Sequence, residues 1–288
     1  MPSLQDLEKP ESELSSELYS SDNKLLGKYF RYNRSPVKFD ELSDELVTTL
    51  LVTEDIRFYD HSGIDLKGLV RASYGVVKNI ATLGSSGLEG GGSTITQQLA
   101  KNLFKIRREK KGKLSGVPFL GLVISKVKEW IVAVKLEEFY TKKEILAMYL
   151  NTAEYGSNSY GIKVAAKTYF NKLPSELNYN ESSIIVGLLN KPTKYNPYFN
   201  PSNATEKRAE IFYNLYKYNV VDKETYDSLK VMDLSLNYKV ENQNVGQATY
   251  FRTVVRNYLI NWAKENGYDL FSDGLKIHTT IDSRLQDH

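Results

Sequence analysis

Apolar residues recur at helical spacing through most of residues 43–219, and capping residues stand before several of these runs. Ser43 can cap the first helix, which His61–Gly63 would end, and its stripe reads Val47, Leu50, Leu51, Glu54 and Phe58. Thr141 and Glu144 form a capping box before another helix. Further helices are predicted over 66–80, 123–134, 162–170, 181–190, 203–219 and 247–265. The pattern therefore predicts a mainly α fold.

Only two short segments, 234–240 and 275–281, alternate as β-strands do. Two strands do not make an independently stable sheet, so we expect an incomplete second domain there. The first 40 residues are polar, with few candidates for a core. The predicted organisation is an extended N-terminal arm over 1–40, a helical domain over 41–230, and the start of an α+β domain over 231–288.

Composition excludes several classes of protein. The 38 Lys and Arg against 35 Asp and Glu leave a net charge of +3, which is too small to imply nucleic-acid binding. With no cysteine, the chain has no disulfide, thiolate metal site or cysteine nucleophile, and no two of its 3 histidines stand at metal-ligand spacing. The longest apolar stretch, 117–124, is far shorter than the about 20 residues of a membrane helix, and no signal peptide is visible.

Glu54 is the first candidate for chemistry, because it lies in an otherwise apolar helical stripe. An apolar wall disfavours the charged form of a carboxylate, which suits a group that accepts and releases a proton. The alternative is a helix-end carboxylate that pairs with Arg57 or Arg71 at the edge of the core.

A glycine-rich segment, 84–92, leads into a helix that Ser93 can cap. One face of this helix is apolar, and the other carries Thr94, Gln98, Lys101 and Lys105. Free backbone N–H groups at such a helix start suit a phosphate or pyrophosphate. The alternative is a flexible loop followed by a well-capped helix.

Lys126 and Glu129 lie on one helix face, three residues apart, and are a further candidate pair. The alternative is an ordinary surface ion pair.

Basic residues between 101 and 113 precede the apolar stretch 117–124, a combination that suits an anionic membrane surface. Nucleic acid is a weaker alternative because stacking aromatics are missing from the basic run, and a solvated loop is the simplest one.

Five segments, taken in chain order, resemble the motifs of the peptidoglycan glycosyltransferase domain of class A penicillin-binding proteins, glycosyltransferase family 51. They are Glu54–Gly63, Gly92–Asn102, Lys126–Glu129, Ile145–Ala166 and Glu181–Pro197. Ser125 stands where the third motif usually has arginine. No single motif is specific, but five in order are. Residues 273–282 resemble the linker that leads into a transpeptidase domain.

The resemblance implies a lysozyme-like fold of two lobes that joins lipid II into β-1,4-linked glycan strands, with inversion at C1 and release of undecaprenyl pyrophosphate. Glu54 would be the general base, Glu129 the second catalytic carboxylate, and Lys126 the cation beside the pyrophosphate. The substrate-binding residues that it implies are Asp55, Phe58, His61, Gly63, Gly92, Ser93, Thr94, Thr96, Gln97, Gln98, Lys101, Asn102, Lys126, Asn151 and Gly156.

The resemblance also implies partners. A divalent metal, Mg or Mn, would bind with pyrophosphate through Glu129, and no organic cofactor is expected. The partners would be lipid II, the growing glycan, a membrane surface reached through 101–124, and cell-wall synthesis proteins. The site of action would be the extracytoplasmic face of the bacterial cytoplasmic membrane, with the anchor absent from this chain.

Two other functions remain open: a lysozyme-like hydrolase and a non-catalytic glycan-binding module. A hydrolase of this kind needs a carboxylic acid and room for water rather than a cation cluster. The Thr, Gln and Lys face near Gln98, together with Lys126, therefore favours transfer over hydrolysis.

Overall fold

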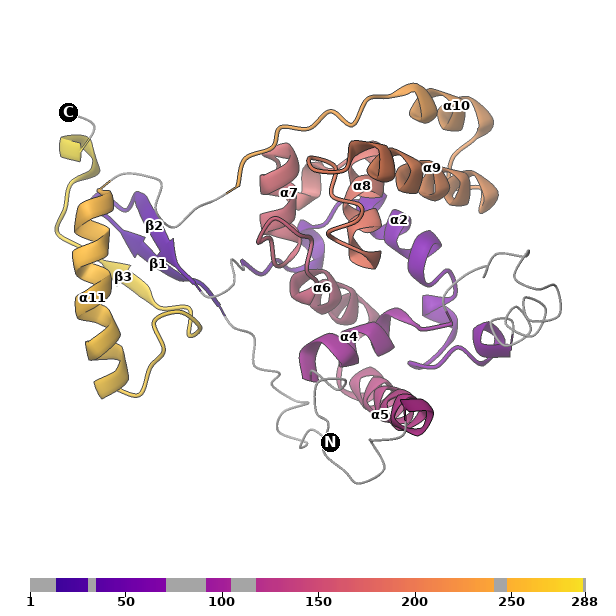
Figure 1. Cartoon of the computed structure of the whole chain (residues 1–288), viewed down its shortest axis with the longest axis horizontal. Coiled ribbons are helices and arrows are strands. Elements are labelled where there is room, and N and C mark those ends of the chain that lie inside the picture. Colours follow the sequence, from indigo (N-terminus) through magenta and orange to yellow (C-terminus); the bar gives the residue numbers. More distant parts are fainter. Residues whose placement is uncertain (1–13, 31–34, 71–91, 105–117, 241–247, 287–288) are drawn as a thin grey trace.

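Helices α2 to α10 form the larger of two parts of the molecule, and a small sheet with α11 forms the other (Figure 1). This computed structural model describes residues 14–30, 35–70, 92–104, 118–240 and 248–286. The larger part contains α2 (Asp44–Glu54), α4 (Ile95–Phe104), α5 (Pro118–Phe139), α6 (Lys142–Thr152), α7 (Ile162–Phe170), α8 (Tyr179–Asn190), α9 (Pro201–Lys217) and α10 (Lys223–Val231). The smaller part contains β1 (Ser16–Tyr19), β2 (Leu25–Tyr29), α11 (Thr249–Glu265) and β3 (Lys276–His278). The predicted mainly α fold is confirmed.

The predicted caps of α2 and α6 are present. Ser43 Oγ accepts a hydrogen bond from Leu46 N–H at 3.2 Å, and Thr141 and Glu144 form the capping box of α6. The cap predicted for α4 is wrong by one residue. Thr94 Oγ1, not Ser93, accepts from the N–H of Gln97 at 3.2 Å, because the helix begins at Ile95.

Helix α2 ends at Glu54, earlier than the apolar stripe predicted. Asp55 leaves the helical conformation, with φ −160° and ψ 75°, and its carboxylate accepts a hydrogen bond from Ile95 N–H at 3.0 Å. Phe58, which the stripe placed in the same helix, lies instead in a 3₁₀ turn, Phe58–Asp60, and is completely buried. A bond to a residue far along the chain thus ends the helix.

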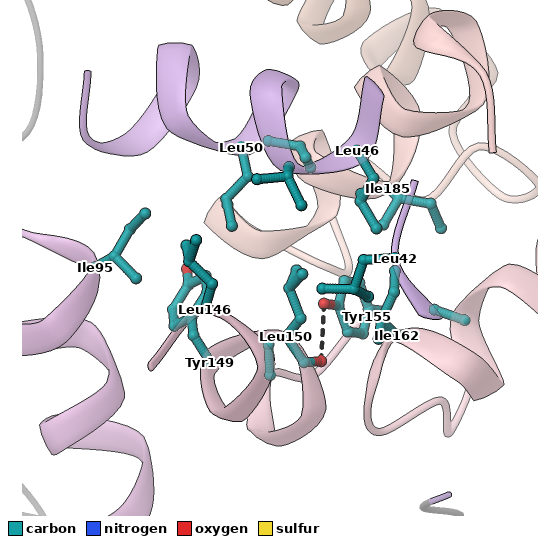
Figure 2. Packing of buried hydrophobic residues seen from close by; sticks show 14 of the residues in the cluster. Leu42, Leu46, Leu50, Ile95, Leu146, Tyr149, Leu150, Tyr155, Ile162 and Ile185 are labelled. Carbon is teal, nitrogen blue, oxygen red and sulfur yellow. Dashed lines mark hydrogen bonds between the residues drawn. The ribbon is translucent and has the colours of Figure 1, made fainter. Parts of the chain in front are cut away.

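The core of the larger part lies where α2, α4, α6 and α8 meet. Figure 2 shows Leu46 and Leu50 of α2 facing Leu146 and Leu150 of α6, all four of them buried completely. Complete burial of one leucine side chain stabilises the fold by about 1.5–3 kcal/mol. The ends of α2, α4 and α6 that carry polar residues are therefore held at fixed positions by a shared apolar centre.

The smaller part brings together residues from the two ends of the described chain. Its sheet has the strand order β2-β1-β3, with β1 antiparallel to β2 and parallel to β3. Leu18 pairs with Ile277, and the apolar side chains of the sheet pack with those of α11 around their own core: Leu18, Leu26, Tyr29, Ala263 and Leu270. The strand predicted over 275–281 is confirmed as β3, which pairs with β1. Both β1 and β2 lie within the segment expected to be an extended arm.

The strand predicted over 234–240 is wrong. These residues form no strand in the structure; Asn237 N–H and Lys239 N–H donate to the carbonyls of Tyr169 and Thr168 at 2.9 and 2.7 Å. Between them, Tyr238 stacks on Tyr198 with ring centroids 4.0 Å apart and donates its hydroxyl to Ser157 at 2.8 Å. The segment alternates because it lies along the end of helix α7 rather than along another strand.

Candidate active site

Glu54 lies half-buried at the end of α2, beside α4 and α6. Gln98 Nε2 donates to Glu54 Oε2 at 2.7 Å, and the Tyr149 hydroxyl donates to Gln98 Oε1 at 3.0 Å. Arg57, one of the two arginines considered as a partner of Glu54, pairs with Asp65 instead, and Arg71 lies outside the described residues. The carboxylate is thus held by an amide and keeps part of its surface open.

Tyr149 lies within the fourth motif but is not among the predicted site residues. Burial raises the pKa of its hydroxyl well above the ordinary value, and the negative charge of nearby Glu54 raises it further. The hydroxyl therefore stays protonated and acts as a donor. Only the fold reveals this residue, because its role depends on α4 and α6 packing together.

Lys126 joins α5 to Ser93, two residues before the start of α4. Its Nζ donates to Ser93 Oγ at 2.6 Å and lies 2.9 Å from Glu129 Oε2. The alternative of an ordinary surface pair is wrong for Glu129, which is only 1% exposed, whereas 30% of the Lys126 side chain remains accessible. A cation that is partly open and held by a buried carboxylate can receive an anionic ligand.

Asp55 and His61 connect the first motif to the second. His61 Nε2 lies 3.1 Å from both carboxylate oxygens of Asp55, and the same carboxylate accepts from Ile95 N–H at the start of α4. A negative charge is favourable at a helix N-terminus. Asp55 is buried, so its described contacts fix α4 against the loop that follows Glu54.

Other residues expected to bind substrate are buried and make contacts within the fold. Thr94 Oγ1 and Gln97 Nε2 both donate to the carbonyl of Gly63, at 2.7 and 3.1 Å. Thr96 Oγ1 donates to Glu137 Oε1 at 2.6 Å. Lys142, also missed in the sequence, pairs with Glu137 at 2.8 Å and donates to the His61 carbonyl at 2.6 Å. These contacts join α4, α5 and α6 to one another and to the segment that follows α2.

Asn151 and two glycines of the predicted set also make close contacts within the fold, and Phe58 is completely buried. Asn151 donates to the Val37 carbonyl at 2.8 Å and accepts from the Val37 N–H at 3.0 Å. Gly63 has φ +85°, and a Cβ there would lie 2.8 Å from the Ala133 carbonyl carbon, so no larger residue fits this approach to α5. Gly156, with φ +74°, passes close to the Pro192 carbonyl.

The remaining predicted residues keep partly open surfaces: Gly92, Ser93, Gln98, Lys101 and Asn102. Gln98 contacts Glu54, and Ser93 contacts Lys126. The structure therefore divides the predicted set into residues whose contacts position the elements of the fold and half-buried residues that a ligand can reach. Glu54, Gln98, Ser93 and Lys126 belong to the second group. This arrangement offers a carboxylate for proton transfer and, on α5, a cation for an anionic group.

No cluster of three or more acidic or histidine side chains that could hold a metal occurs within the described ranges. Glu129 therefore offers a single carboxylate, already paired with Lys126. Magnesium is commonly bound by one or two carboxylates together with phosphate oxygens of a substrate and water. The residues fit a metal only if a bound pyrophosphate supplies further oxygens.

The basic and apolar stretch over 101–124 lies largely outside the described residues. The described part of α5 exposes one apolar stripe: Ile124, Val127 and Ile131 are 37%, 41% and 40% exposed. Among helices with described residues, none combines the length and apolar content that crossing a bilayer requires.

Comparisons with known proteins point to one family. A family model described as transglycosylase matches residues 22–216. Penicillin-binding protein 1A of Escherichia coli strain K12 is 31% identical over 286 residues, which are 99% of this chain and 31% of the relative. Penicillin-binding protein 1A of Haemophilus influenzae is 34% identical over 279 residues, 96% of this chain and 30% of the relative. The chain thus spans about a third of the length of these relatives.

A solved structure of penicillin-binding protein 1A from Haemophilus influenzae also matches, with 21% identity and a TM-score of 0.48. The match covers 96% of this chain and 28% of that one.

Proposed function

The chain belongs to the transglycosylase family, and we propose that it joins lipid II into β-1,4-linked peptidoglycan strands with inversion at C1 and release of undecaprenyl pyrophosphate. The observation that carries this proposal is that one segment, 93–98, contacts both groups: Gln98 holds the half-buried Glu54, and Ser93 accepts from the partly open cation Lys126. A transferase that expels pyrophosphate needs both kinds of group, one for the acceptor and one for the leaving group.

Glu54 acts as the general base on the acceptor. Its carboxylate takes the proton of the 4-hydroxyl of one sugar, and that oxygen forms the new bond to C1 of the growing chain. The bond between C1 and the pyrophosphate oxygen breaks, and attack from the opposite face inverts C1. Gln98 supports this role, because its amide holds the carboxylate in place without a competing positive charge.

Lys126 acts on the leaving group. Charge develops on the pyrophosphate as its bond to C1 breaks, and a positioned cation stabilises that charge most effectively where water is largely excluded. Ser93 and the buried Glu129 fix the direction of Lys126 Nζ through contacts of 2.6 and 2.9 Å. Lys101 and Asn102, both half-buried on α4, add a second cation and an amide to the same proposed groove.

A divalent metal would bind jointly to Glu129 and the pyrophosphate, and it would neutralise phosphate charge there. We expect calorimetric titration of the protein with Mg²⁺ alone to show no binding, and titration in the presence of inorganic pyrophosphate to show binding that Glu129→Gln abolishes. Binding of Mg²⁺ alone that survives in Glu129→Gln would contradict this assignment.

The exposed stripe on α5 and the basic residues before it support docking to an anionic membrane at its extracytoplasmic face. Lipid-linked substrates lie in such a surface, so docking brings Glu54 to them. Vesicles with anionic lipid should bind the protein more strongly at low than at high salt, because counterions screen the basic residues. Binding that is equal with neutral vesicles would argue against this surface.

Purified protein, fluorescent lipid II and detergent, with products separated on a gel, test the reaction itself. Wild type should give a polymer ladder, and Glu54→Gln should lower the rate about 10²- to 10⁴-fold because the general base is lost. Glu138→Gln is the matched control, since Glu138 is exposed on α5. Shortening of lipid-free glycan strands would favour the hydrolase, and absence of polymer from folded wild type would contradict the proposal.

A further inference from the structure

Tyr149 is a buried hydroxyl group next to the proposed base that the mechanism above does not use. We propose that Tyr149 is a positioning residue that holds the Gln98 side chain in the one orientation that donates to Glu54. The inference rests on the proposed function only for its effect on rate, because the hydrogen bonds themselves exist without substrate.

The direction of the hydrogen bonds follows from what each group can offer. An ionised carboxylate only accepts, so the side of the Gln98 amide that faces Glu54 must be its NH₂ group. The amide oxygen then faces Tyr149, whose hydroxyl must donate. Because the Tyr149 hydroxyl stays protonated, the three groups form a chain with a single direction, from phenol to amide to carboxylate.

The side chain of Tyr149 is held in place by its packing. It is 1% exposed on α6 and packs in the core that α6 shares with α2 and α4, where Figure 2 shows it beside Leu146 and near Ile95. The capping box at Thr141 fixes the start of the same helix. Gln98, in contrast, is half-buried on α4 and has rotatable bonds of its own. The fixed phenol therefore determines how the amide points.

Loss of the hydroxyl removes that control. The amide oxygen then has no hydroxyl to accept from, and the side chain can turn away and leave Glu54 without a donor. This disturbs the carboxylate that takes the proton, while the groups that bind pyrophosphate on α5 stay in place. We therefore expect Tyr149→Phe to lower kcat about 10-fold with little change in KM, which is the size expected for one oriented hydrogen bond to a charged group.

The experiment is a double-mutant cycle in the polymerisation assay with Tyr149→Phe, Gln98→Ala and the double variant. If Tyr149 acts through Gln98, its substitution lowers kcat in the wild-type background and has almost no effect in Gln98→Ala. Tyr155→Phe is the matched control, since Tyr155 is also completely buried but donates to the Leu150 carbonyl at 3.0 Å. Equal losses in both backgrounds, or wild-type kcat in Tyr149→Phe, would overturn the inference.

A second measurement needs neither activity nor a folded Tyr149→Phe variant. With tyrosine labelled at ¹³Cζ, the nuclear magnetic resonance signal of Tyr149 should shift in Gln98→Ala, because its hydroxyl loses its acceptor, and that of Tyr155 should not. An unchanged Tyr149 signal overturns the inference even in an active enzyme. If wild type forms no polymer but the signal shifts, the proposed function fails while the hydrogen-bonded arrangement stands.

Discussion

Neighbouring polar residues at the start of α4 have different tasks because they face different ways. Thr96 and Gln97 are buried and bond to Glu137 and the Gly63 carbonyl, whereas Gln98 is half-buried and bonds to Glu54. One more residue along a helix turns a side chain by about 100°. A single polar run therefore supplies both the contacts that hold α4 and the amide that holds the proposed base.

Asp55→Asn should lower stability by about 1–2 kcal/mol, because it removes a negative charge from the N-terminus of α4 and from beside His61. Urea unfolding followed by circular dichroism measures the change. Asp227→Asn is the control, since Asp227 is exposed and its pair with Lys223 should contribute at most about 1 kcal/mol. Equal losses of stability in the two variants would show that the contacts of Asp55 contribute no more than those of an exposed carboxylate.

The pair of Lys126 and Glu129 should be coupled far more strongly than a surface pair. A double-mutant cycle with Lys126→Met and Glu129→Gln should give a coupling free energy of about 1–3 kcal/mol in urea unfolding, because Glu129 is buried. The exposed pair of Lys223 and Asp227 should give about 0.5 kcal/mol or less. If the pair of Lys126 and Glu129 had a coupling free energy as small as that of the exposed pair, the role given to Glu129 would be contradicted.

At the scale of elements, local signals predicted the caps of α2 and α6 but not the end of α2. Ser43 and Thr141 cap their helices through side-chain bonds to residues three positions on, so nearby sequence contains the whole signal. The end of α2 depends on Asp55 bonding to Ile95, 40 residues away. The same limit applies to the site: the spacing placed Thr94 and Gln98 on one polar face, but packing against Gly63 buries Thr94.

The approach of the Gly63 loop to α5 allows no side chain. Gly63→Ala should lower the free energy of unfolding by about 2–5 kcal/mol, since it combines a positive φ with a Cβ only 2.8 Å from Ala133 backbone. Gly267→Ala is the control: Gly267 also has a positive φ, +77°, but a Cβ there meets nothing within 4 Å. It should cost only about 1–2 kcal/mol. Thermal unfolding of both variants separates steric from backbone effects.

At the scale of the whole molecule, the sheet joins segments that are far apart in the chain. Leu18 of β1 and Ile277 of β3 pair directly, and nothing local in either short strand specifies that partner. This is why an extended arm and an incomplete domain were expected in place of one α/β unit. Among the described residues, the cores of the two parts share no buried residue, so we expect each part to be stabilised mainly by its own core.

Leu18→Ala should therefore loosen the smaller part alone. Leu18 is completely buried at the centre of its core, and removing its side chain should destabilise that part by about 2–5 kcal/mol. Hydrogen exchange followed by mass spectrometry should show faster exchange in β3 and α11, with α4 and α6 unchanged. Leu25→Ala, at a 42% exposed position of β2, is the control and should leave both parts protected. Faster exchange in α4 and α6 as well would show that the two parts unfold together, and the polymerisation rate of Leu18→Ala should then also fall. If the parts are independent, the site around Glu54 keeps its geometry, and the polymerisation rate stays at the wild-type value.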